Sequence, residues 1–488
     1  MKFPRKQFLC ALLAGLMLAM AGCGGSTDTE TTADTAPAVT ETESVETEPE
    51  YTPLPEKDMD SWTMRYLNYN TTWLTWAELI LTAEEQNGDT LNDAVYNRNS
   101  RISEQYNCVF EETTVDYVQK IIGQLVQSGD AGAELAMLHD EHVINNYLNG
   151  YLQTWDALPH VDFNAEYWNK SSTETFSNMG KVFAATGDFS LAQSTRSFIL
   201  LFNKDMYADL GLTEDLYRMA ADGKWTMDAL LKAEQVAVAD LDGDGAMTDK
   251  DRYGTSGAVK LYFGSLVTGA GIKYIDIDTD GKPYFAIPGN EYAISVMSDI
   301  LEKHNGTNIY LPLFNEVHSG STEATVLFKN NQTLFNGTSM RAVSNYRDME
   351  SDIGILPFPK YSEDQDAYHA LTSGGTMAVL PKTLNPEIYE NVGIVLEALC
   401  RDSHNDLIPV YKEILLKSRY ARDEGSAAML DIIFASATYD IGLSVFTTDT
   451  YYKYMVPYLT FSNTFASLTQ EITDMVNARL EDMLEFTE

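Results

Sequence analysis

Residues 61–70 read SWTMRYLNYN and alternate polar and apolar side chains, as a half-buried β-strand does. The segments that follow read in turn as a helix, a strand, a helix and a buried strand: TLNDAVYNRNSRISEQYN (90–107), CVFEETTVD (108–116), VDYVQKIIGQLVQSGD (115–130) and AELAMLHD (133–140). This alternation predicts an α/β fold with a mainly parallel sheet. Ligands of such sheets lie at the carboxyl ends of the strands, which places the Asn70 to Trp76 loop and the His139–Asp140 step at a crevice.

The chain begins MKFPRKQFLCALLAGLMLAMAGCGG, in which a basic start precedes an apolar run from Phe8 to Ala21. Such a run is typical of a secretory signal and is too short to be read as a membrane-spanning helix. The Ala21-Gly22-Cys23 step resembles a bacterial lipobox, which implies a lipoprotein signal peptide over residues 1–22 and a lipid on Cys23. An ordinary signal peptide with an incidental cysteine is the alternative.

Residues 23–57 contain almost only Ser, Thr, Glu, Asp, Pro, Gly and Ala. Such a segment buries too little apolar surface to fold, so we expect a disordered acidic tether. A tether behind a lipidated cysteine indicates a protein anchored at the extracellular face of the cell membrane. The formal charge of −39 disfavours nucleic acid and anionic membrane surfaces as partners.

The segment after the tether is too long for one hydrophobic core, so two lobes are expected. It contains two cysteines, Cys108 and Cys400. Their spacing does not indicate a disulfide framework, and we expect two buried thiols, although a single bridge remains open.

An acidic loop begins at Asp240, after the segment AEQVAVA (233–239), and ends at Asp251. It fits the EF-hand calcium pattern. Hard oxygen ligands at alternate positions surround one Ca²⁺ if the chain turns sharply at a glycine, here Gly245. The predicted ligands are Asp240, Asp242, Asp244, the carbonyl of Ala246, Thr248 and Asp251. Asp251 replaces the usual glutamate, which predicts weak affinity and a structural role. A solvated acidic turn is the alternative.

Three later segments resemble a known family: GKVFAATGDFSLAQSTRSFILLFNKDMYADLGL (180–212), GKWTMDALLKAEQVA (223–237) and SDIGILPFPKYSEDQDAYHALTSGGTMAVLP (351–381). In their order and spacing they are similar to bacterial extracellular solute-binding proteins of family 1. These are the maltose-binding-protein-like carbohydrate receptors of ABC importers. The calcium-like loop and the Tyr253-Gly254 step fall where many relatives carry an Asp-Gly-rich loop.

The resemblance implies a periplasmic-binding-protein type II fold, in which two α/β lobes joined by a hinge hold the ligand between them. Lobe 1 would comprise residues 58–185 with 355–404, and lobe 2 residues 186–354 with 405–488. Crossovers are expected near Ala185–Gly187 and Ile355–Pro359. Helices from about residue 405 onward should pack mostly on lobe 2.

Candidate ligand-binding residues come from two sources. The loops at strand ends and the first crossover contribute Trp73, Trp76, Asp140 and Asp188. The resemblance implies that Tyr262, Phe263 and Arg341 also face the ligand. Aromatic faces and polar side chains are the groups that bind sugars.

The expected function is therefore capture of a carbohydrate, an oligosaccharide, by a monomer that delivers it to the permease subunits of an ABC transporter. Motifs of several enzyme classes, such as G-x-S-x-G, H-E-x-x-H and the P-loop, are absent from the sequence, which favours a binding protein over an enzyme. Two alternatives stay open: a cell-surface glycoside hydrolase, which needs only two carboxylates in a cleft, and a calcium-dependent glycan-binding adhesin.

Overall fold

The computed structural model describes residues 51–70, 81–311, 321–417, 424–444, 446, 448 and 450–486. The chain divides into two compact units, Met1–Pro53 and Leu54–Glu488, and the second unit holds the elements given below. The predicted signal peptide, Cys23 and the tether before residue 51 lie outside the described residues. Within the described ranges, every helix is too short or too polar to cross a membrane.

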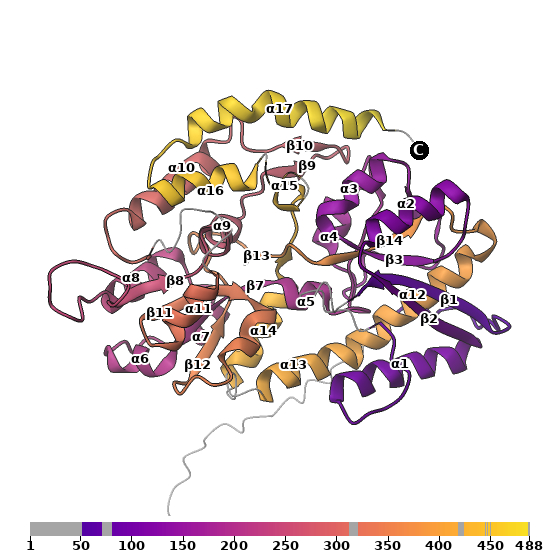
Figure 1. The fold of residues 1–488 in the computed structure, drawn as a ribbon, viewed down its shortest axis with the longest axis horizontal. Helices are drawn as coiled ribbons and strands as arrows, with labels where there is room; N and C mark the ends of the chain where they lie inside the picture. Colours follow the sequence, from indigo (N-terminus) through magenta and orange to yellow (C-terminus); the bar gives the residue numbers. More distant parts are fainter. Residues whose placement is uncertain are drawn as a thin grey trace, which may run out of the picture. The chain divides into compact units, whose positions relative to one another are not determined.

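The first sheet has five strands in the order β2-β1-β3-β14-β4 (Figure 1). They are β1 (Trp62–Tyr69), β2 (Cys108–Val115), β3 (Leu135–His139), β4 (Leu152–Gln153) and β14 (Thr376–Pro381). β1 is parallel to β2 and β3, whereas β14 is antiparallel to β3 and β4. The strand and helix alternation predicted for residues 61–140 is therefore confirmed, and the antiparallel strand comes from far along the chain.

Local sequence explains where the helices of this sheet begin and end. The Asp89 side chain accepts the backbone N–H groups of Leu91 and Asn92 at the start of α1, and Asn107, with φ of 49°, ends that helix. Gly129, with φ of 70°, ends α2 in the same left-handed conformation. The helical elements are α1 (Thr90–Tyr106), α2 (Val118–Ser128), α3 (Asp140–Leu148), η1 (Trp155–Ala157), η3 (Pro386–Ile388) and α12 (Tyr389–Asn405).

The second sheet has the order β12-β7-β11-β8, with β7 (Phe198–Asn203), β8 (Tyr253–Ser256), β11 (Thr333–Ser339) and β12 (Ile353–Leu356). β7 is antiparallel to β11 and β12, and β11 is parallel to β8. All six residues of β7 are buried, as its continuous apolar sequence FILLFN predicts for a strand covered on both faces.

The other helices and strands between residues 204 and 346 lie on the same side of the molecule as the second sheet. They are α6 (Lys204–Asp209), α7 (Leu216–Ala221), α8 (Met227–Ala237), α9 (Val259–Gly269), β9 (Ile275–Ile277), β10 (Pro283–Phe285), α10 (Glu291–His304), α11 (Ser321–Lys329) and η2 (Met340–Tyr346). β9 and β10 form a separate antiparallel hairpin.

Three segments of chain meet where the two sheets join. Ser197, after α5 (Ala192–Arg196), forms an antiparallel bridge with Thr372. β13 (Ala370–Leu371) in turn pairs in parallel with β15 (Ala437–Thr438). These short pairings connect the chain segments that pass between the two large sheets.

The crossings lie later in the chain than the sequence predicted. Ala185 still pairs with Ala378 of the first sheet, and Ile355 still pairs with Leu201 of the second. The two predicted crossover positions are therefore the points where the chain leaves each sheet. The sequence of a strand end does not show which strand it pairs with. The predicted crossings were therefore placed too early in the chain.

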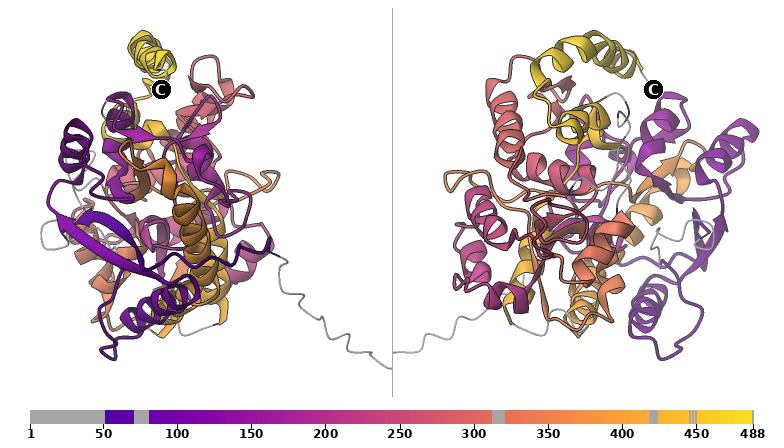
Figure 2. Two further views of the ribbon diagram at one scale, coloured as in Figure 1. Left: turned by 90° about the vertical axis from the view of Figure 1, so that its right-hand side faces the viewer. Right: turned by 60° about the vertical axis from the view of Figure 1, so that its left-hand side comes forward.

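The C-terminal helices are α13 (Leu407–Lys417), α14 (Glu424–Ala435), α15 (Ile441–Ser444), α16 (Tyr451–Thr460) and α17 (Phe465–Glu485). α14 packs on α7 and β12, α16 on α9, and α17 on α10 and β10, all on the second sheet's side. α13 differs from the prediction, because it packs on α1 and α12 of the first sheet's side as well as on α14. Figures 1 and 2 show α17, in yellow, as the outermost helix of this region.

The remaining short elements lie next to the first sheet: α4 (Lys170–Thr175), β5 (Ser177–Asn178) and β6 (Lys181–Val182). The end of α17 reaches them, since the side-chain amide of Asn178 donates to the carbonyl of Met483 over 3.0 Å. Cys108 and Cys400 are both free and buried, which confirms the prediction of two buried thiols. Burial raises the pKa of both, to about 11 for Cys108.

Candidate functional site

Asp140 lies where β3 ends and α3 begins, at the carboxyl end of a parallel strand as predicted. Its Oδ2 accepts the backbone N–H of Gly374 (2.7 Å), and its own N–H donates to the carbonyl of Gly375 (3.0 Å). Its Oδ1 is buried and has no hydrogen-bond partner among the described residues. The nearest nitrogen, Nδ1 of His139 at 3.2 Å, already accepts the N–H of Glu141 and therefore has no proton to donate.

Charge and burial act in opposite directions on Asp140. The side chain is 1% exposed, and burial raises the pKa of its carboxyl to about 6, against the lowering effects of the Gly374 N–H and the Arg196 charge. Burial also lowers the pKa of His139 to about 4, so this neighbouring imidazole is neutral at physiological pH. A buried carboxyl oxygen without a partner is an acceptor that a hydrogen-bond donor, such as a hydroxyl, an amine or a water molecule, can satisfy.

Arg196 lies against the same loop, at the end of α5. Its Nε donates to the carbonyl of Ser373 (3.3 Å). Gly374 has φ of 70°, and a Cβ added there would come within 2.5 Å of Nη2 of Arg196. The left-handed backbone therefore favours glycine at 374, and a side chain there would also displace the end of Arg196.

The first turns of α9 and α16 pack against each other on the second sheet's side. The hydroxyl of Tyr451 donates to the carbonyl of Lys260, and the Lys260 ammonium lies 5.8 Å from the centre of the Tyr452 ring. Burial and then the Arg196 charge lower the pKa of Lys260, while Glu141 opposes them. Burial and then Glu141 and Asp140 raise the pKa of Tyr452. The charges of Arg196, Asp140 and Glu141 thus affect the ionisation of Lys260 and Tyr452.

A cavity of about 590 Å³ lies at another part of this junction, between α4 with β5–β6 and the β9–β10 hairpin. It is lined by Thr173, Glu174, Ser177, Gly180, Val182, Lys273, Asp276, Ile277, Asp278, Thr279, Asp280 and Gly281. The turns of the two hairpins touch, because the N–H of Met179 donates to the carbonyl of Gly281 (3.0 Å). Elements of both sides therefore form the walls of this cavity.

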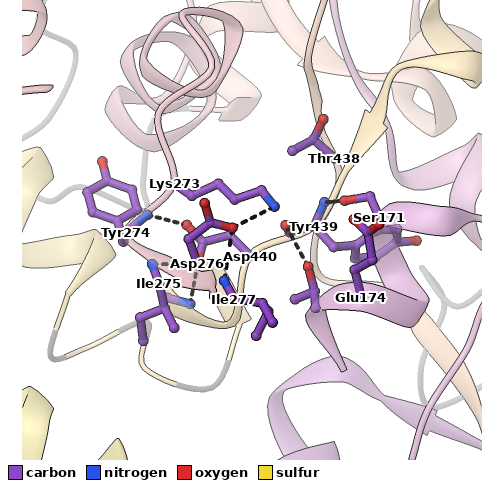
Figure 3. Close-up of polar contacts among 12 residues, drawn as sticks. Ser171, Glu174, Lys273, Tyr274, Ile275, Asp276, Ile277, Thr438, Tyr439 and Asp440 are labelled. Carbon is purple, nitrogen blue, oxygen red and sulfur yellow. Dashed lines mark hydrogen bonds and ion pairs between the residues drawn. The ribbon is translucent and has the colours of Figure 1, made fainter. Parts of the chain in front are cut away.

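The segment after β15 forms hydrogen bonds with both walls of the cavity (Figure 3). Tyr439 donates its N–H to the Ser171 hydroxyl (2.9 Å) and accepts at its carbonyl from the Thr175 hydroxyl (3.1 Å). The next residue, Asp440, accepts the N–H groups of Ile275 (3.1 Å) and Gly442 (2.7 Å). Figure 3 also shows Lys273 paired with Asp276 over 3.0 Å, with Glu174 across from it.

Two of the predicted ligand-binding residues, Trp73 and Trp76, lie outside the described residues. Asp188 is buried on the first sheet's side, where it accepts from Nδ1 of His404 (2.6 Å) and Nε2 of Gln193 (3.2 Å). The carboxylate of Asp188 raises the pKa of His404. Asp188 thus ties the first crossing to α12, a role that explains its burial without a ligand.

The predicted ligand contacts of Tyr262 and Phe263 are wrong. Both side chains are 0% exposed in the core beside the second sheet. The Tyr262 hydroxyl is hydrogen-bonded to Oε1 of Glu234 (2.7 Å) and lies 3.0 Å from Nε2 of His304. Phe263 stacks on Tyr458, with ring centres 4.6 Å apart. Helix α9 is apolar on almost every face and is therefore buried almost all round, so its aromatic rings pack inward.

Arg341 is half-buried in η2, directly after β11. The preceding residue, Met340, donates its N–H to the carbonyl of Ser197 (2.9 Å), so Arg341 lies beside the first crossing. The sequence interpretation did not single out Arg196 and Gly374, which pack together beside Asp140. It also did not single out Lys260 and Tyr452, although Lys260 is a single charge in the apolar run AVKLYFGSLVTG.

The predicted metal loop closes between Ala239 and Arg252, which form an antiparallel bridge. Carboxylate oxygens of Asp240, Asp242 and Asp244 all lie within 4.8 Å of one another. Gly245 has φ of 84°, the turn that the calcium pattern requires of its glycine. The loop residues Ala246 and Thr248 donate their N–H groups to Asp244 (2.8 Å) and Asp251 (2.7 Å), respectively.

Asp251 is not part of this group of three carboxylates. It is 0% exposed, and its two oxygens accept the N–H groups of Leu241 (2.8 Å) and Thr248 (2.7 Å). These backbone hydrogen bonds, that of Leu241 first, lower the pKa of Asp251. The structure thus brings three of the six predicted ligands together, in a form that fits a hard cation.

No family model matches the chain, and no curated protein matches its sequence. Solved structures do resemble it. A cyclo/maltodextrin-binding protein complexed with maltotetraose has a TM-score of 0.56 at 14% identity, over 90% of this chain and 100% of its own. An ABC substrate-binding protein from Listeria monocytogenes in complex with cycloalternan has a TM-score of 0.51 at 14% identity, over 86% and 100%.

The GacH receptor of Streptomyces glaucescens, solved unliganded and with acarbose, has a TM-score of 0.50 at 12% identity, over 86% of this chain and 99% of its own. At these identities the likeness shows the fold. The chain therefore has the periplasmic-binding-protein type II fold that the sequence predicted, with two α/β lobes, one around each large sheet.

Proposed function

We propose that this protein is an extracellular solute-binding protein that captures an oligosaccharide between its two lobes and delivers it to the permease of an ABC importer. The observation that carries the proposal is the Asp140 carboxyl, buried at the junction of the lobes with one oxygen unpartnered among the described residues. An unpaired buried acceptor costs about 1–3 kcal/mol, which a ligand hydroxyl would recover. The similar structures were solved with maltotetraose, cycloalternan and acarbose, which supports a sugar ligand.

We infer that the ligand is bound without being cleaved. A glycosidase requires two carboxylates that flank the scissile bond. At Asp140 the neighbouring carboxylate is Glu141, whose side chain is 53% exposed, and the solved structures of the same fold are binding proteins. Incubation with an oligosaccharide should therefore leave the sugar intact.

The lipid on Cys23 and the acidic tether over residues 23–57 would hold the body at the extracellular side of the membrane, next to the permease. The support for this arrangement is the signal sequence and its cysteine. Two or more acyl chains give durable anchoring, whereas one chain gives only marginal binding.

We propose further that the Asp240–Asp251 loop binds Ca²⁺ as a structural clip. The support is the convergence of three carboxylates around a glycine turn. Asp251 faces the backbone of its own loop, so the affinity should be weaker than that of a loop with a bidentate glutamate.

Solution scattering with a panel of oligosaccharides tests the receptor function. A ligand closes the lobes only if it binds the closed state better than the open state, so a cognate sugar should both bind and compact the protein. Asp140→Asn should weaken binding, while Asp209→Asn on exposed α6 serves as the control. Turnover of the sugar would instead assign the protein to the hydrolases.

A further inference from the structure

One short loop, residues 373–375, holds Asp140 in place. The N–H of Gly374 donates to Oδ2 of the Asp140 carboxyl over 2.7 Å, and the carbonyl of Gly375 accepts the N–H of Asp140 over 3.0 Å. The next residue, Thr376, begins β14 and pairs with His139 of β3. Both the backbone and the side chain of Asp140 therefore depend on where this loop lies.

The half-buried side chain of Arg196 packs along the whole of this loop. Its Nε donates to the carbonyl of Ser373 over 3.3 Å. A Cβ added to Gly374 would come within 2.5 Å of Nη2 of Arg196, and a Cβ added to Gly375 would lie 3.0 Å from its Cγ. The two glycines thus leave the space that the arginine side chain occupies.

The residue after Arg196 fixes the start of the same loop. Ser197 forms an antiparallel bridge with Thr372, and their buried hydroxyl oxygens lie 3.2 Å apart. Two successive residues at the end of α5 therefore contact the segment that holds Asp140. A site side chain keeps a productive orientation when the groups that hold it are themselves fixed by packing and hydrogen bonds.

We propose that Arg196 is a positioning residue for ligand binding, which holds the 373–375 loop so that Asp140 presents its unpartnered oxygen to a ligand hydroxyl. This inference rests on the proposed receptor function and adds a residue to its site. Arg196 acts through the loop and the Asp140 carboxyl, and the sugar itself contacts Asp140.

The charge of Arg196 supports the same role. Burial raises the pKa of Asp140 to about 6, while the Gly374 N–H and then the Arg196 charge lower it. Both therefore favour the ionised carboxylate, which accepts a stronger hydrogen bond than the neutral acid. Loss of the Arg196 charge should raise the pKa of Asp140. The other titratable groups around Asp140 are Tyr69, His139, Glu141, His142, Tyr439 and Tyr452.

A double-mutant cycle on the full mature chain tests this role. Calorimetry at pH 8 with maltotetraose, cycloalternan and a panel of xylo-, manno- and galacto-oligosaccharides compares wild type, Arg196→Gln, Asp140→Asn and the double variant. Arg196→Gln should weaken binding about threefold to tenfold, the effect of one hydrogen bond. In the Asp140→Asn background the same change should have no further effect, because the group that Arg196 positions has already been removed.

The pH profile of affinity from pH 5 to 8 gives a second measurement. Wild-type affinity should fall as the pH decreases through about 6, and Asp140→Asn should lose this dependence. Arg196→Gln should move the midpoint upward. Arg196→Lys keeps the charge but not the Nε donor, so it should weaken binding without moving the midpoint. Arg218→Gln on exposed α7 is the matched control and should change neither quantity.

The outcomes separate this inference from the receptor function. Equal affinity of wild type and Arg196→Gln at pH 8, additive losses in the cycle, or an unmoved midpoint would each overturn the positioning role and leave the receptor function intact. Additive losses would mean that Arg196 binds the sugar itself or acts only on the fold. If Arg196→Gln does not fold in a melting scan, Arg196→Lys takes its place in the cycle. Absence of binding by every sugar in the panel would overturn both.

Discussion

Glu234 on α8 should make the stability of this protein fall as the pH rises above neutrality. The side chain is 0% exposed and is hydrogen-bonded to Tyr262, and burial raises its pKa to about 8. The hydrogen bonds around Glu234 also indicate that its carboxyl is protonated. Nδ1 of His304 lies 2.6 Å from the carbonyl of Ile300, which can only accept, so Nδ1 carries the proton of the neutral ring.

Nε2 of that neutral ring must then accept from the hydroxyl of Tyr262, 3.0 Å away. The Tyr262 oxygen also lies 2.7 Å from Oε1 of Glu234, and a hydrogen bond between these two oxygens needs a second proton. Only protonated Glu234 supplies that proton. Burial keeps His304 neutral, since it lowers the pKa of the ring to about 4.

The sign and size of the effect follow from linkage. The carboxyl ionises near 4.5 in the unfolded chain and near 8 in the folded one, so the folded state binds more protons between these values and loses stability as the pH rises. Buried His139 and His304, with folded pKa values lowered to about 4, act in the opposite direction only below about 6.5. Between pH 6.5 and 8 the Glu234 contribution alone is about 2 kcal/mol, at ~1.36 kcal/mol per unit.

Urea unfolding of wild type and Glu234→Gln at half-unit steps from pH 6.5 to 8 measures this contribution. The difference between the two curves should grow by about 2 kcal/mol over that interval, because glutamine has no proton to lose. Glu214→Gln, at an exposed ion pair with Lys232, should shift stability without changing its pH slope. Parallel curves for wild type and Glu234→Gln would show that the buried carboxyl is already ionised and refute the reasoning.

The other predictions concern the anchor, the metal loop, the core and the ligand site. Cys23→Ser should release the protein from the membrane fraction, and unchanged retention would exclude the lipid anchor. Calcium at ten times its Kd should stabilise the body by about 1.4 kcal/mol, seen as a chelator-sensitive melting temperature that Asp244→Ala abolishes. Tyr262→Ala should destabilise the body by about 3–5 kcal/mol, as for other buried aromatic residues, and so behave as a core variant in denaturant titrations. Asp140→Ala should weaken sugar binding by about 1–3 kcal/mol in calorimetry with its melting temperature preserved, and equal affinity would place the ligand elsewhere.

The alternation of strands and helices between residues 61 and 140 was predictable because periodicity and short turns are local properties. The position of Asp140 was predictable for a related reason, since parallel strands present their carboxyl ends at one edge of the sheet. The place of β14 between β3 and β4 was not, because its pairing depends on a segment more than 200 residues away along the chain.

The error at Tyr262 has a simple geometric cause. The resemblance placed Tyr262 on α9 but could not show which side of that helix faces the core. Lys260 and Tyr262 are two residues apart, and at 3.6 residues per turn their side chains point about 200° apart around α9. If Lys260 faces the junction, Tyr262 must face the core, as it does. Arg196 and Gly374 were missed because they come together only where the crossing segments meet.

The order of strands in the two sheets also determines when each can form as the chain is synthesised. The second sheet uses only residues 198–356, so all four of its strands emerge in one continuous stretch. The first sheet begins at residue 62, but β14, which joins β3 to β4, ends only at Pro381. At ~5–20 residues per second, β1 to β3 are synthesised more than ten seconds before β14, and one edge of the sheet stays uncovered during that time. The lobe that starts first therefore finishes last, and its incomplete sheet is the stage at which a holding chaperone would be needed.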